Sequence, residues 1–145
     1  SGEVLEHVED DEKAVREFSR VLKENGVCII SVPAHPNLWD YTDEWAGHVR
    51  RYERARLFLL FEQNGFRVEE IRSWGFPLVR CYHRFLYLPY TARKEGAAGP
   101  DDAEGVPGAS GFPVLTAILQ AVFQVDSLFG RLPWGIGWLL VARRK

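Results

Sequence analysis

Apolar residues at helical spacing, with charged residues between them, predict a helix near the start of the chain. A continuous apolar run predicts a strand directly after it. Asp10 or Asp11 can cap the start of this helix, and Gly26 suits the left-handed position beyond its end. Residues 27–32 then form a continuous apolar run, which is typical of a parallel strand covered on both faces. The pattern therefore predicts half of a βαβ unit. The apolar positions at helical spacing are Val15, Phe18, Val21 and Leu22.

A second helix and strand follow in the middle of the chain. Residues 54–64 predict a helix that ends at Asn64 and Gly65. Residues 66–74 alternate only loosely between apolar and polar positions, which indicates an edge or near-edge strand. The inward-facing positions of the helix are Leu57, Leu60 and Phe61.

Residues 77–133 have a different pattern, with two apolar segments around a polar one. Residues 78–88 are compatible with a helix that ends before Pro89. Residues 93–111 show no periodicity and are rich in Gly, Pro and acidic residues, so we expect a flexible loop. Residues 113–129 predict an apolar helix that something must cover, because its polar positions form one narrow stripe. That stripe consists of Thr116, Gln120, Gln124 and Ser127.

Composition excludes some partners and favours one core. A chain of 145 residues fits a single domain, and its net charge of −2 gives no general attraction for nucleic acid. Cys28 and Cys81 lack the spacing of a metal or redox motif, which favours a reducing compartment. No leader pattern opens the chain, and no uncharged run is long enough to span a membrane. We therefore expect a cytoplasmic location.

Four short motifs resemble class I S-adenosylmethionine-dependent methyltransferases, most closely the small-molecule and quinone-type branch. The first motif has the form S-x-E-V-L-E-H-V, and the second is R-V-L-K-x-x-G on the first helix. Asn-Gly-Phe before the second strand and a G-H-x-R-x-Y block complete the resemblance. The matching residues are Ser1, Glu3, Val4, Leu5, Glu6, His7, Val8, Arg20, Val21, Leu22, Lys23, Gly26, Gly47, His48, Arg50, Tyr52, Asn64, Gly65 and Phe66.

The resemblance implies an α/β fold: the C-terminal half of a Rossmann-like methyltransferase sheet with a helical insertion at 77–133. The final strand, at 136–143, would run antiparallel between strands 66–74 and 27–33. The family's Gly-rich cofactor loop is not found in this sequence. We therefore expect residues 1–145 to be one partial domain from a longer enzyme, inactive when isolated.

The resemblance also implies a cofactor site and a metal site. Ser1, Gly2 and Glu3 would lie on the strand end that passes the methionine part of S-adenosylmethionine. In quinone-pathway relatives the E-x-x-E-H residues bind a divalent cation such as Mg²⁺, and here these are Glu3, Glu6 and His7. Such a cation would lower the pKa of a phenolic acceptor. The alternative is that Glu6 and His7 only cap and solvate the start of a helix.

The G-H-x-R-x-Y block implies a loop over the acceptor. His48 could act as a general base, because a histidine titrates near neutral pH. Arg50 and Arg51 could orient an anionic acceptor, and Tyr52 could form a wall of the pocket. Alternatively, the arginines pair with acidic residues of the preceding loop and fix its shape. Those acidic residues are Asp40, Asp43 and Glu44.

Two classes of function follow. The first is methyl transfer to a small, fairly apolar acceptor. The second is a non-catalytic binding module, in which helices 78–88 and 113–129 form a lid, a subunit interface or a peripheral membrane contact. Another nucleotide-binding α/β enzyme would require a different motif at residues 3–7.

Overall fold

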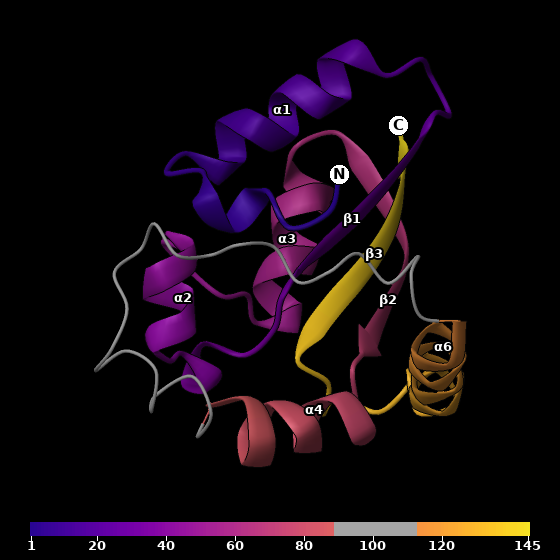
Figure 1. Ribbon diagram of the computed structural model, residues 1–145. Helices are drawn as coiled ribbons and strands as arrows, with labels where there is room; N and C mark the ends of the chain where they lie inside the picture. The colour runs from indigo at the N-terminus through magenta and orange to yellow at the C-terminus, as the bar shows by residue number, and fades with distance from the viewer. Residues whose placement is uncertain (89–112) are drawn as a thin grey trace.

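A computed structural model describes residues 1–88 and 113–145, apart from the side chains of residues 113–116 and 119. Its centre is a sheet of three strands, in the order β1-β3-β2 (Figure 1). The strands are β1 (Val27–Pro33), β2 (Phe66–Trp74) and β3 (Gly137–Arg144). The last strand pairs antiparallel with both neighbours, so β1 and β2 point in the same direction. The strand order expected from the resemblance is confirmed.

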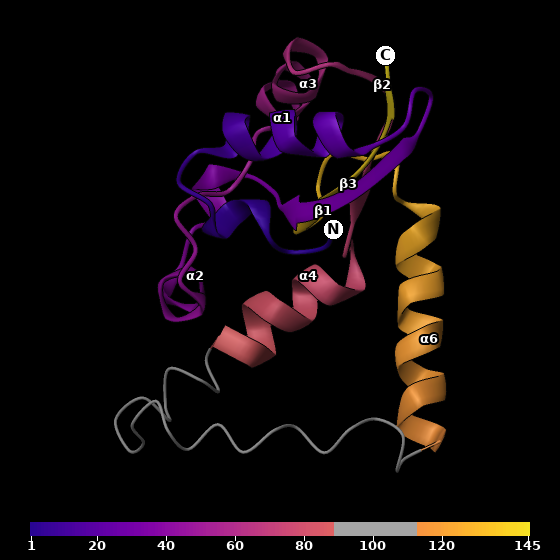
Figure 2. The ribbon, with the colours of Figure 1, turned by 90° about the horizontal axis from the view of Figure 1, so that it is seen from above.

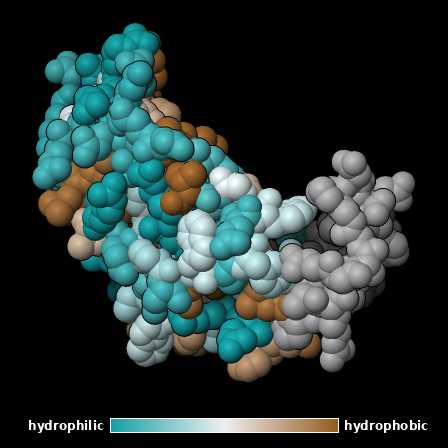
Figure 3. Space-filling model, turned by 90° about the vertical axis from the view of Figure 1, so that its left-hand side faces the viewer, coloured by the Kyte–Doolittle hydropathy of each residue, from teal (hydrophilic) through white to brown (hydrophobic). Residues whose placement is uncertain are grey.

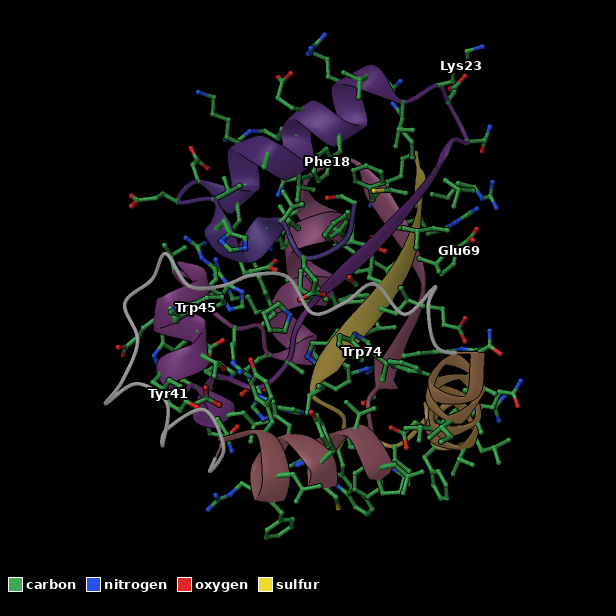
Figure 4. The ribbon with its side chains drawn as sticks, in the orientation of Figure 1. Phe18, Lys23, Tyr41, Trp45, Glu69 and Trp74 are labelled. Atoms are coloured by element: carbon green, nitrogen blue, oxygen red, sulfur yellow. The ribbon has the colours of Figure 1, made fainter. Side chains whose placement is uncertain are left out.

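Two helices and the sheet enclose the hydrophobic core. Helix α1 (Asp11–Val21) contributes Val15, and α3 (Arg54–Gln63) contributes Leu57, Leu60 and Phe61. The sequence predicts all four as inward positions, but it also predicts Val21 on the apolar face of α1, and that side chain is 65% exposed. Figure 4 shows Phe18 on the side of α1 that faces the sheet, where it packs against the core. The strand residues of this core are Cys28, Ile30, Val32, Phe66, Trp138, Leu140 and Ala142.

The prediction that both faces of β1 are covered is wrong for the described residues. Its side chains alternate between buried and exposed, and Ile29 is 54% exposed. The second face is open because α1 and α3 pack on one side of the sheet only. A continuous apolar run shows that a strand is suited to burial on both faces, but not that both faces are covered in this chain.

The described residues between β2 and β3 form two helices at one end of the molecule. Helix α4 (Leu78–Tyr82) continues as the π-helical segment η3 (His83–Tyr87), and α6 (Pro113–Leu128) precedes β3. Both lie beyond the carboxyl ends of β1 and β2, across the strand direction (Figure 2). The helices predicted in this segment are confirmed, and the predicted loop at 93–111 falls almost entirely outside the described residues.

Short helical turns connect the strands to the other elements. They are η1 (Leu5–His7), η2 (Pro36–Leu38) and α2 (Tyr41–Ala46). Within the described residues, no helix has the length and apolar character needed to cross a membrane.

Candidate active site

A cavity of about 540 Å³ opens at the end of the sheet where β1 and β2 terminate. Ligands of open α/β sheets bind at this carboxyl edge. Figure 4 shows Trp74, which lines the cavity, at the end of β2. The polar residues that line the cavity are Glu3, Asn37, Asp40, Thr42, Asp43, His48, Arg51, Arg80, His83 and Arg84.

Asp43 is the centre of the polar network in this cavity. Its side chain is 1% exposed, and it accepts hydrogen bonds from His48 Nδ1 at 2.8 Å and from Arg51 Nε at 2.8 and 2.9 Å. The backbone N–H of Asp40 also donates to it, at 2.9 Å. Burial alone raises the pKa of Asp43, but the Arg51, Asp40 and His48 hydrogen bonds outweigh burial and lower it. Asp43 is therefore ionised at neutral pH.

Local chain geometry explains why these groups meet. Asp40 caps α2, and Asp43 completes the capping box by accepting from the Asp40 backbone. Gly47 ends α2 in the left-handed conformation, with φ of 74°. The chain reverses there, so that His48 and Arg51 return to Asp43. Parallel bridging between Ala34 and Tyr52 then holds this segment beside the end of β1.

The protonation of His48 follows from its partner. An ionised carboxylate can only accept a hydrogen bond, so His48 Nδ1 carries the proton that is donated to Asp43. The neutral imidazole then has an unprotonated Nε2 that can accept a proton. His48 is half-buried and lines the cavity.

A second cluster lies against His48. Donor atoms of Glu6, His7 and His48 all lie within 4.8 Å of one another. His7 Nδ1 lies 3.1 Å from the Gly47 carbonyl oxygen, while His7 Nε2 is 3.9 Å from Glu6 Oε1. Glu6 is completely buried, and neither of its carboxylate oxygens has a hydrogen-bond partner among the described residues. Burial raises the pKa of Glu6.

Ser1, Gly2 and Glu3 lie alongside β1. Gly2 forms a parallel bridge with Ser31, and the Glu3 carboxylate accepts a 2.8 Å hydrogen bond from Ser31 Oγ. A side chain at Gly2 would meet Ser31 Oγ at 3.2 Å, so the two backbones approach closely here. Glu3 also lines the cavity.

Comparison with known proteins identifies the first half of the chain. Residues 1–71 match a family described as "Methyltransferase domain". This part of the chain is therefore similar to methyltransferase domains. No curated protein matches the chain significantly.

Solved structures with this methyltransferase fold cover nearly the whole chain. One is a protein from Galdieria sulphuraria assigned as a sarcosine dimethylglycine methyltransferase, with a TM-score of 0.54, 18% identity, and coverage of 99% of this chain and 51% of that one. Another is the [4+2]-cyclase SpnF, with a TM-score of 0.53, 18% identity, and coverage of 99% and 47%. At this identity the likeness establishes the fold alone. The chain spans about half the length of these structures.

Tyr52 and Arg50 lie outside the cavity. The Tyr52 side chain is fully buried, and its hydroxyl donates to Leu5 O at 3.2 Å and Asp11 Oδ2 at 3.1 Å. Burial, together with the Asp11 carboxylate, raises the pKa of Tyr52. Arg50 pairs with Asp11 at 2.8 Å instead of the expected loop acids. Tyr52 therefore occupies a core position, not the pocket wall that the resemblance implies.

Sequence reasoning missed two residues of the cavity. In the sequence, Asp43 is only one of several acidic residues that could pair with an arginine. In the structure it is the partner of both His48 and Arg51. His83, which the sequence motifs do not single out, lines the cavity beside Arg80 and Arg84. Burial lowers the pKa of His83. The available signal was spacing, because positions 80, 83 and 84 share one side of a helix.

Proposed function

We propose that residues 1–145 form the acceptor-binding half of an S-adenosylmethionine-dependent methyltransferase in which His48 is the general base. The observation that carries this proposal is the Asp43–His48 pair, with its 2.8 Å hydrogen bond, on the wall of a cavity at the carboxyl edge of the sheet. Methyl transfer to a hydroxyl or phenol requires removal of the acceptor proton near the moment of attack.

Each member of the polar network has a distinct part in this proposal. His48 Nε2 accepts the acceptor proton, and the resulting imidazolium is stabilised by the Asp43 carboxylate at Nδ1. Arg51 keeps Asp43 ionised and fixes its orientation through the guanidinium–carboxylate pair. The cavity holds the acceptor against His48 and limits its contact with water.

The residues present fit one side of a cofactor site. The close backbone approach at Gly2 and the Glu3 carboxylate at the cavity support Ser1, Gly2 and Glu3 as candidates to hold the amino acid end of S-adenosylmethionine. When bound, this cofactor supplies an electrophilic methyl group. The sequence contains no G-x-G-x-x-G motif, so these three residues account for only part of such a site.

The same geometry supports a competing role for His48 as a metal ligand. His7 and His48 each use Nδ1 to contact an oxygen, which leaves Nε2 available, and Glu6 adds an unpartnered carboxylate. Ligating histidines are commonly oriented in this way by a carbonyl or a carboxylate. Two imidazoles and one carboxylate suit Zn²⁺ better than the Mg²⁺ expected from the resemblance. The structure groups His48, instead of Glu3, with Glu6 and His7.

The turnover number of a His48 variant tests the proposal that His48 is the general base. The protein expressed from the complete reading frame should transfer labelled methyl groups to a panel of phenols, with carboxylates and amines as comparison acceptors. His48→Gln should lower kcat about 10²-fold or more without changing the affinity for S-adenosylmethionine. His83→Gln is the matched control, since His83 also lines the cavity but has no hydrogen bond to Asp43. An equal loss in both variants would contradict the assignment of His48 as base.

A further inference from the structure

The helix that runs through residues 78–87 turns two arginines toward the cavity. Arg80 and Arg84 lie four residues apart, so they share one side of the helix, and both line the cavity. The large apolar side chains of Phe85 and Leu86 are exposed and do not line it. In Figure 3, hydrophilic and hydrophobic residues both occur along the lower edge, at the height of α4, whereas hydrophilic residues cover most of the upper end near α1. The helix therefore brings positive charge to the cavity.

The carboxylates that line the cavity already have partners of their own. Asp43 forms an ion pair with Arg51 at 2.8 Å. Asp40 caps the start of α2, and Glu3 accepts a hydrogen bond from Ser31 Oγ. Within residues 1–88 and 113–145, neither arginine of the helix forms an ion pair with a carboxylate. The cavity therefore holds two guanidinium groups that lack a paired anion.

The two arginines have donors available for a ligand. Arg80 donates one N–H to the carbonyl oxygen of Trp134, which fixes its side chain and leaves the other N–H groups of the guanidinium available. Arg84 is exposed and has no hydrogen bond to another described residue. Like charges at this spacing destabilise a helix, and an anion bound by both would remove that repulsion. His83 adds no charge at neutral pH, because burial lowers its pKa.

We propose that Arg80 and Arg84 bind an anionic group, a carboxylate or a phosphate, on the methyl acceptor. The planar guanidinium matches the oxygen atoms of either group and can donate two hydrogen bonds to it. The family resemblance gives this role to Arg50 and Arg51, but a buried aspartate holds each of those side chains. The proposal rests on the proposed function, because it makes the bound anion a part of the acceptor.

The apolar part of the cavity wall suits the rest of such an acceptor. Trp74 and Ile136 both line the cavity. A side chain at Gly137 would collide with the Trp74 indole, so this glycine allows the indole to lie at the cavity. The volume of about 540 Å³ is ample for one aromatic ring with two substituents. The acceptor class that fits is a phenol with an anionic substituent remote from the hydroxyl group that is methylated.

The binding of three phenols that differ in one substituent tests the proposal without requiring methyl transfer. The probes are para-hydroxyphenylacetate, para-hydroxyphenyl phosphate and the neutral para-hydroxyphenylacetamide. Ligand-observed NMR measures their Kd values on the protein expressed from the complete reading frame. We expect one or both anionic probes to bind about tenfold or more tightly than the amide, and the tighter of the two identifies the anion as carboxylate or phosphate. Added salt should weaken binding of the anionic probes only.

Arg84→Gln is the cleaner of the two variants, because Arg80 also supports the Trp134 carbonyl. It should weaken binding of the preferred anionic probe about fivefold or more and leave the amide unchanged, while Arg84→Lys, which keeps the charge, should lose less. Arg80→Gln should change binding in the same direction. In turnover, Arg84→Gln should raise KM for the anionic acceptor with little change in kcat, unlike His48→Gln.

Arg16→Gln is the matched control, since it removes the same charge from α1, at the other end of the molecule. It should leave all three Kd values unchanged, and circular dichroism should show that every variant is folded. Equal binding of the amide and both anions to the wild type, or equal losses in Arg84→Gln and Arg16→Gln, would overturn the proposal. So would an Arg84→Gln variant that weakens the amide as much as the anions. Anion binding that depends on Arg84, with no methylation of any phenol, would support the anion subsite and contradict the proposed function.

Discussion

Asp126→Ala should destabilise the chain by removing a helix cap that comes from a different helix. The Asp126 carboxylate accepts from the backbone N–H groups of Leu78 at 2.8 Å and Val79 at 3.0 Å. These donors belong to the first turn of α4, which has no capping side chain of its own. The carboxylate therefore fixes α4 to α6 and orients the residues that α4 places in the cavity.

The magnitude follows from the two bonds. A hydrogen bond to a charged group contributes about 1.5–3 kcal/mol, and loss of a cap costs about 0.5–2 kcal/mol. Because water can reach part of the α4 start, we expect a loss below the sum for two such bonds and at the upper end of the cap range, about 2 kcal/mol for Asp126→Ala. That loss corresponds to a Tm lowered by roughly 4–8 °C for a chain of this size. Asp126→Asn retains one acceptor oxygen and should lose about half as much.

Urea titration followed by circular dichroism measures both variants. Ser127→Ala serves as control, because its hydroxyl bonds only within α6, to the Gln124 carbonyl, and a surface change of this kind costs less than about 0.5 kcal/mol. The cap would be refuted by an Asp126→Ala variant as stable as the control. Identical losses for the Ala and Asn variants would also count against it.

Three further predictions concern the site. Glu6→Gln should raise Tm, and the gain over wild type should grow as pH rises above about 4.5. Because burial raises the pKa of Glu6, the protonated carboxyl contributes stability at low pH, and this stability is lost as the carboxyl ionises. Melting curves from acid to neutral pH in a chelator, with exposed Glu24→Gln as control, check this, and a pH-independent difference would contradict it. Calorimetric titration of the 145-residue chain with S-adenosylmethionine should give a Kd weaker than about 10 μM, which corresponds to about −7 kcal/mol. Weak binding is expected because the sequence contains no G-x-G-x-x-G loop. Tighter binding would show that Ser1, Gly2 and Glu3 suffice. A similar titration with Zn²⁺ and Mg²⁺ decides the metal hypothesis. The hypothesis requires that the chain binds Zn²⁺, that His7→Ala abolishes this binding, and that Glu3→Gln leaves it intact.

The sequence predicts the elements of this fold better than it predicts their partners. Helices and strands follow from periodicities within a few residues, and the strand order follows from the family resemblance. The open face at Val27 and Ile29 is not predicted, because an apolar run does not reveal what covers it. The same limit applies to α6, where the described side chains of Ile118, Phe123, Val125 and Leu128 are exposed although the pattern requires a covering partner.

Long-range polar contacts explain what was missed at the site. His48 and Arg51 are visible in a motif, but their shared partner Asp43 depends on the cap of α2 and the reversal at Gly47. Spacing within residues 3–7 suggests a metal set of Glu3, Glu6 and His7. The turn η1 begins only at Leu5, and Glu3 instead bonds to Ser31 across the sheet edge. Such contacts depend on tertiary structure and leave no local pattern.

The turnover of an Asp43 variant tests the central claim most directly. In the protein from the complete reading frame, Asp43→Asn should lower kcat by about 10²-fold or more, since the amide no longer holds the Nδ1 proton of His48 or stabilises its positive charge. The account is contradicted if Asp43→Asn retains kcat within about threefold of wild type.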